Sequence, residues 1–90
     1  MLEVTDSAAD MIRQLLEVAE LPDTGGLRIA QRDDHPALAM RLTGAAEPDD
    51  VVLTQHDATV FLGPIAALRL AGQTLDARAD DGGTSFFLGA

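Results

Sequence analysis

The chain has 90 residues and a formal net charge of −9, from 15 acidic residues against 6 basic ones. This negative charge argues against binding to nucleic acid or to an acidic membrane surface. There is no cysteine, which excludes disulfides, thiolate nucleophiles and cysteine-held zinc or iron–sulfur centres. Hydrophobic residues make up 47% of the chain, enough for one core. We therefore expect one folded domain over residues 1–90, with proteins or cations as partners.

The location of the protein is predicted from what the chain lacks. No stretch approaches the roughly 20 apolar residues that cross a bilayer. Residues 1–4 have neither the basic nor the apolar region of a signal peptide. We expect a cytoplasmic protein that does not bind membranes.

The clearest local signal is an amphipathic helix that begins near Thr5. Thr5, Asp6 and Ser7 can each cap its N-terminus, and Pro22 with residues 25–26 marks its end. Its polar face is predicted to face solvent. The apolar residues that recur at the helical period are Ala8, Met11, Ile12, Leu15, Leu16 and Ala19.

After this helix the pattern changes to the alternation that is typical of strands. Polar turns at residues 33–36 and 80–83 join two pairs of strands into hairpins, and residues 64–70 predict a short second helix. These elements predict an α+β, mostly β domain: a small β-sandwich or flattened barrel of short mixed strands, with the first helix on one face. The predicted strands are residues 27–32, 38–42, 51–53, 58–62, 73–79 and 84–88.

Six segments along nearly the whole chain carry a family resemblance. They are residues 4–9 (VTDSAA), 26–29 (GLRI), 50–52 (DVV), 60–64 (VFLGP), 70–76 (LAGQTLD) and 86–88 (FFL). Their order and spacing resemble the HesB/IscA-like family of A-type iron–sulfur cluster carriers, and residues 70–76 resemble the family's Leu-x-Gly-x-x-Leu-Asp. The resemblance implies a HesB-like fold, a role in iron–sulfur cluster assembly and an oligomeric state, usually a homodimer.

The resemblance also implies three cysteine ligands, one in the first hairpin and a Cys-Gly-Cys pair in a C-terminal tail. None of them is present: His35 lies nearest to the first position, and the chain ends at Ala90, where the tail would begin. One imidazole cannot replace three thiolates, because even Rieske centres keep two cysteines. We therefore expect no catalytic residue, no cofactor-binding residue and no cofactor. The predicted function is a non-enzymatic scaffold for protein partners, including those of iron–sulfur assembly, with a homodimer left open.

The alternative is a protein that binds a divalent metal, iron included. Asp33, Asp34 and His35 offer ligand types that iron(II), manganese or zinc accept, but three consecutive residues can face one ion only in a bent turn. The competing interpretation is that the aspartates shape the turn and His35 is an exposed loop residue. The acidic pairs at residues 49–50 and 80–81 receive the same interpretation as solvated turns.

Two further pairs of residues carry side chains that are suited to chemistry or to ion pairing. His56 and Asp57 could form a base and its orienting carboxylate, but adjacent strand residues point to opposite faces, which favours an exposed loop pair. Arg28 and Arg41 lie on predicted neighbouring strands, and we expect them to pair with acidic loops of the same protomer or across a dimer. An exposed strand edge, or residues 86–87, could be covered by a second subunit.

Overall fold

The computed structural model describes residues 1–32 and 34–89. Both predicted helices and all six predicted strands are present, and a two-residue strand near the N-terminus is added. The elements are β1 (Glu3–Val4), α1 (Asp6–Val18), β2 (Gly26–Gln31), β3 (Leu38–Thr43), β4 (Val51–Gln55), β5 (Ala58–Leu62), α2 (Pro64–Arg69), β6 (Thr74–Asp80) and β7 (Gly83–Gly89).

The strands form two mixed sheets, one ordered β3-β2-β5-β4 and the other β1-β6-β7. The predicted hairpins are confirmed, because β2 pairs antiparallel with β3 and β6 pairs antiparallel with β7. Two pairings are parallel, β2 with β5 and β1 with β6. The α+β, mostly β class is confirmed; of its two variants, the described residues form two sheets and no closed barrel.

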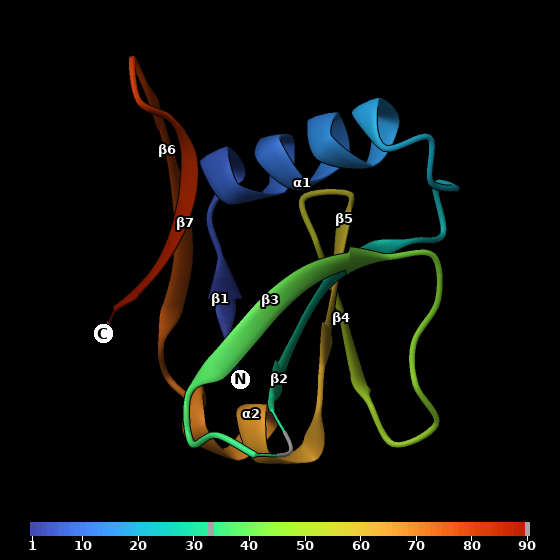
Figure 1. Cartoon of the computed structure of the whole chain (residues 1–90), viewed down its shortest axis with the longest axis vertical. Coiled ribbons are helices and arrows are strands. Elements are labelled where there is room, and N and C mark those ends of the chain that lie inside the picture. The colour runs from blue at the N-terminus through green and yellow to red at the C-terminus, as the bar shows by residue number, and fades with distance from the viewer. Residues whose placement is uncertain (33, 90) are drawn as a thin grey trace.

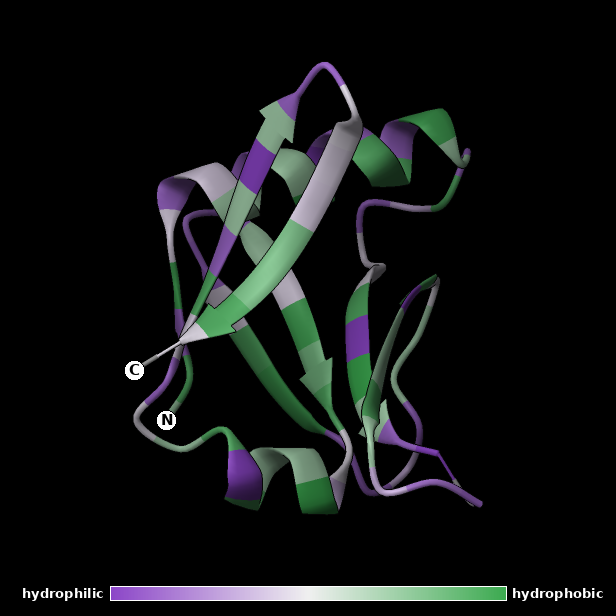
Figure 2. Ribbon diagram, turned by 60° about the vertical axis from the view of Figure 1, so that its left-hand side comes forward, coloured by the Kyte–Doolittle hydropathy of each residue, from purple (hydrophilic) through white to green (hydrophobic). Residues whose placement is uncertain are grey.

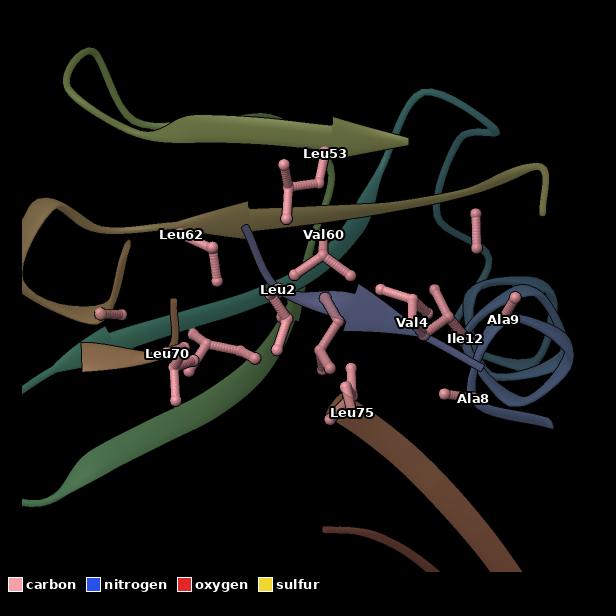
Figure 3. Close-up of a cluster of buried hydrophobic side chains, with 14 of the residues drawn as sticks. Leu2, Val4, Ala8, Ala9, Ile12, Leu53, Val60, Leu62, Leu70 and Leu75 are labelled. Atoms are coloured by element: carbon pink, nitrogen blue, oxygen red, sulfur yellow. The ribbon is translucent and has the colours of Figure 1, made fainter. Parts of the chain in front are cut away.

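The hydrophobic core lies between the two sheets and under α1. Figure 1 shows α1 across one end of the sheets and α2 near the other end. In Figure 3, side chains from both sheets gather around Leu2, among them Val60 and Leu75, which are fully buried. The buried face of α1 consists of Ala8, Ala9, Met11, Ile12 and Leu16.

Of the apolar residues predicted to form one face of α1, Ala8, Met11, Ile12 and Leu16 are buried. Leu15 is only partly buried and Ala19 is exposed. The residues of its polar face are exposed, as predicted. In β6, hydrophobic and hydrophilic residues alternate along the strand (Figure 2). No helix of the described residues is long and apolar enough to cross a membrane.

The N-terminus of α1 is fixed to the second sheet through Thr5. Of the three candidate caps, the structure selects Thr5, whose Oγ1 accepts a hydrogen bond from the Ala8 N–H at 3.1 Å. The same hydroxyl donates to Asp76 Oδ1 on β6 at 2.7 Å. Asp76 Oδ1 also accepts a hydrogen bond from the Ala77 N–H. The hydrogen bond from Thr5 foremost, and then the one from Ala77, lower the pKa of the Asp76 carboxyl.

Gln55 at the end of β4 connects the two sheets. Its side-chain Oε1 accepts from the Val4 N–H at 2.7 Å, and its Nε2 donates to the Leu2 carbonyl at 2.8 Å. Leu2 and Val4 are almost fully buried, so their backbone groups need these partners. One amide side chain thus supplies β1 with a hydrogen-bonding neighbour on the side away from β6.

Candidate functional site

His35 lies in the exposed turn between β2 and β3, as the loop interpretation predicts. Its Nδ1 accepts a hydrogen bond from the Ala37 N–H at 3.1 Å, so Nε2 is the ring nitrogen that this turn contact does not use. Asp34 is exposed in the same turn. Asp33, the third candidate ligand, lies outside the described residues. Within residues 1–32 and 34–89, no group of three or more His, Cys, Asp or Glu residues could hold a metal ion.

The residues of this chain do not fit an iron–sulfur cluster. Clusters are held by thiolates, and the sequence contains no cysteine at any of its 90 positions. At the hairpin where the resemblance implies the first cysteine, the chain offers one exposed imidazole that already takes part in the turn.

The other acidic loops differ from one another. Asp49 is exposed. Asp80 is the exposed last residue of β6 and Asp81 begins the β6–β7 turn, where Asp80 Oδ1 accepts from the Gly82 N–H at 2.9 Å. Asp50 is different, because only 1% of its side-chain surface is exposed. The solvated-turn interpretation is therefore right for Asp49 and wrong for Asp50, which faces an arginine on β2.

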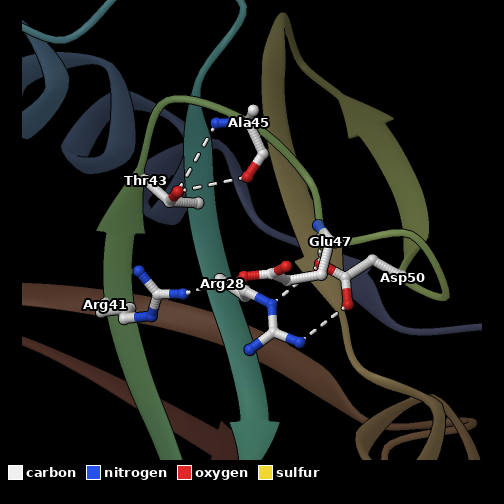
Figure 4. A network of polar contacts seen from close by, with 6 residues as sticks. All are labelled: Arg28, Arg41, Thr43, Ala45, Glu47 and Asp50. Atoms are coloured by element: carbon white, nitrogen blue, oxygen red, sulfur yellow. Dashed lines mark hydrogen bonds and ion pairs between the residues drawn. The ribbon is translucent and has the colours of Figure 1, made fainter.

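That arginine is Arg28, which binds Asp50 through two parallel contacts (Figure 4). Its Nε lies 2.8 Å from Asp50 Oδ2, and its Nη2 lies 2.9 Å from Oδ1. Asp50 Oδ2 also accepts from the Glu47 N–H at 2.9 Å. The hydrogen bonds from Arg28 hold the pKa of the Asp50 carboxyl below its usual value, although burial works in the opposite direction. This pair fastens the β3–β4 loop to the outer face of β2.

Arg28 lies directly opposite Arg41 in the β2–β3 ladder. Like charges in this position destabilise a sheet unless anions neutralise them. Asp50 neutralises Arg28, and Glu47 approaches Arg41 with its Oε1 3.6 Å from Nη2. The predicted pairing of both arginines with an acidic loop is confirmed within the protomer.

His56 and Asp57 form the turn between β4 and β5, as an exposed pair. Both have positive φ, 50° and 64°, which is typical of the two-residue turns that join antiparallel strands. The His56 Nδ1 lies 2.8 Å from Asp6 Oδ1 at the start of α1, and Arg13 donates to the His56 carbonyl. The imidazole therefore contacts the helix rather than the adjacent carboxylate.

Solved structures with a similar arrangement of elements include those of IscA and SufA. A crystal structure of IscA with a [2Fe-2S] cluster superposes with a TM-score of 0.79 at 22% identity, covering 99% of this chain and 84% of that chain. SufA of Escherichia coli, described as involved in the biosynthesis of iron–sulfur clusters, gives 0.78 at 22% identity, over 98% of this chain and 78% of SufA.

A third structure is a protein from Aquifex aeolicus solved by NMR, with a TM-score of 0.72 and 20% identity over 99% of this chain and 90% of that one. No family model matches the chain, and no curated protein matches its sequence. The chain therefore has the fold of IscA and SufA, which confirms the fold that the resemblance implies.

Proposed function

We propose that this protein is a non-enzymatic, cysteine-free relative of IscA and SufA that serves as a protein-interaction scaffold in iron–sulfur cluster assembly. One observation carries the proposal: nearly the whole chain has the IscA fold, while the sequence has no thiolate to hold a cluster. In this proposal the chain keeps the overall shape of a carrier and acts on other proteins through its surface, without a cluster ligand.

The described residues support a role without catalysis. Apart from the covered side chain of Asp50, their buried residues include no polar or charged one. The two carboxyls with a lowered pKa, Asp50 and Asp76, are each hydrogen-bonded to structural partners rather than directed into a cleft. Active sites usually combine a cleft with titratable groups of perturbed pKa. The proposal includes a cytoplasmic location, partners from iron–sulfur assembly, and a homodimer as the state to be tested by light scattering at micromolar concentration.

The test is an anaerobic titration of the purified protein with ferrous iron, with and without sulfide, followed by calorimetry and visible absorption. The scaffold proposal expects neither saturable heat nor cluster absorption. It also expects the immobilised protein to retain iron–sulfur assembly proteins from its own source cells, with each interaction repeated using purified components. Saturable formation of a cluster would overturn the proposal.

A second candidate function is binding of a divalent metal ion by Asp33, Asp34 and His35. The exposed Asp34 and the Nε2 of His35 in one turn favour it. If this site exists, the ferrous iron titration without sulfide gives a saturable signal that His35→Ala abolishes. His56→Ala is the matched control, because His56 is an exposed turn histidine on another hairpin.

A further inference from the structure

The outer face of the four-stranded sheet carries an open hollow over β2 and β3. Arginines surround it at Arg28, Arg32 and Arg41, and small residues lie between them at Ala30 and Ala39. Arg28 is opposite Arg41 and Ala30 is opposite Ala39, so the basic pair and the small pair are adjacent rungs of one ladder. Side chains two residues apart on a strand share a face.

A second hollow continues the first toward α2. It shares Arg28 and Ala30 with the first hollow and reaches Gly63, Pro64 and Ile65 at the start of α2. Ile65 is 47% exposed, so its aliphatic side chain is accessible at this end of the hollow. The two hollows share lining residues and together form one groove, which we call the arginine groove. Arginines line it over β3 and β2, and Pro64 and Ile65 line it where α2 begins.

The charge of the groove contrasts with that of the chain. Three of the 6 basic residues line it, on a protein with a net charge of −9. Asp50 already neutralises Arg28, and Asp34 lies at the rim. Arg41 is held less firmly, because its one ion-pair contact to Glu47 is 3.6 Å long and both side chains are more than half exposed. Its guanidinium can therefore turn to another carboxylate.

The composition of the groove indicates the kind of ligand. Guanidinium groups favour carboxylates, and the apolar end favours an aliphatic or aromatic side chain. A long polyanion would be repelled by the rest of this acidic chain. A short protein segment with one or two carboxylates beside an apolar residue meets both conditions without that repulsion.

We propose that the arginine groove is the docking site for a short acidic segment of a partner protein. A carboxylate of that segment meets Arg41 and Arg32, and an apolar side chain lies against Pro64 and Ile65. This inference rests on the proposed scaffold function, for which it names a surface and the chemistry of the partner.

The test uses the full ¹⁵N-labelled chain and a capped synthetic peptide, Gly-Glu-Leu-Asp-Leu-Gly. The matched probe carries glutamine and asparagine in place of glutamate and aspartate, and inorganic phosphate is titrated separately. We expect saturable changes of amide chemical shifts at residues 28–32, 39–41, 63 and 65 with the acidic peptide. The amide peptide should bind at least about fivefold more weakly, and added salt should weaken the acidic one.

Two variants and a control complete the experiment. Arg41→Gln and Arg32→Gln should each weaken peptide binding, while Arg78→Gln, on β6 of the other sheet, should leave it unchanged. A dispersed amide spectrum shows that each variant is folded. Shifts scattered over the surface, equal binding of both peptides, equal loss in Arg78→Gln, or phosphate alone reproducing the whole effect would overturn the proposal.

The outcome is separable from that of the iron titration. Cluster formation would overturn the scaffold function while peptide binding to the groove could still be observed. Absence of peptide binding would overturn the docking proposal and would leave the proposed scaffold function unchanged.

Discussion

Arg28 and Asp50 are 22 residues apart in sequence and bind each other through two hydrogen bonds, with the carboxylate almost fully covered. The side chain of Arg28 is 18% exposed, so this ion pair is only partly accessible to water. Charges in such a position are stabilising only while both partners are present. The pair holds the β3–β4 loop in place and offsets the repulsion between Arg28 and Arg41.

Removing the charge of Asp50 should destabilise the protein strongly. Asp50→Asn leaves Arg28 partly covered without its anion, and we expect a loss of about 2–4 kcal/mol in the free energy of unfolding. Urea denaturation measures it. Glu47→Gln is the matched control, since its exposed pair with Arg41 should contribute less than about 1 kcal/mol. Equal losses in the two variants would contradict the role assigned to Asp50.

Stability should fall at acid pH through the same carboxylate. The folded-state pKa of Asp50 is lowered from 3.8, so its contribution is present above that value and is lost as the pH falls through the folded pKa. Asp76 has the same direction of shift. The stability difference between the native protein and Asp50→Asn should therefore shrink between about pH 5 and pH 2, as measured by urea denaturation at each pH. A difference that stays constant with pH would be inconsistent with this assignment.

The N-terminus of α1 should depend on Thr5 as its capping residue and not on Ser7. Thr5→Ala removes the acceptor for the Ala8 N–H and the donor to Asp76. We expect it to lower the free energy of unfolding, measured by thermal or urea denaturation, by about 1–2 kcal/mol. Ser7→Ala changes an exposed hydroxyl two residues later and should stay within about 0.5 kcal/mol of the native protein. If Ser7→Ala cost as much as Thr5→Ala, the cap would have been misassigned.

Replacing Gln55 should destabilise the protein, whether its amide is removed or is exchanged for a carboxylate. Gln55→Ala leaves the Val4 N–H and the Leu2 carbonyl without their partner, at a cost of about 1–3 kcal/mol in the free energy of unfolding. Gln55→Glu keeps the acceptor for Val4 but removes the donor to Leu2, so it should also destabilise. Gln14→Ala, on the exposed face of α1, is the control and should be near neutral in the same urea experiment. Intact stability in Gln55→Ala would show that β1 does not depend on this contact.

The local pattern of the sequence predicts most of the elements. The helical period places α1, strand alternation with a polar turn places the β2–β3 hairpin, and Pro64 marks the start of α2. These predictions succeed because each depends on interactions between residues that are close along the chain. The prediction that Arg28 and Arg41 lie on neighbouring strands succeeds for the same reason, since a short turn joins β2 to β3.

The candidate site could be predicted only in part. Asp49 and Asp50 are the same residue type in one loop, and nothing in the local sequence distinguishes the exposed carboxylate from the covered one. The difference arises because the loop folds back onto β2, where only Asp50 reaches the guanidinium. Likewise, His56 contacts Asp6 because the β4–β5 turn lies beside the start of α1.

By itself, the sequence determined the acidic charge, the absence of thiolates, the succession of helices and strands, and the likeness to the IscA fold. Only the tertiary structure decided which elements that are distant in sequence are neighbours. Gly26, which the sequence indicates as the end of the helical segment, begins β2 so close to β5 that an added Cβ would lie 2.2 Å from the Thr59 carbonyl oxygen. That approach depends on the parallel β2–β5 pairing, in which Leu27 lies opposite Val60. Long-range pairing follows from packing in the core, and the local order of residues does not record it.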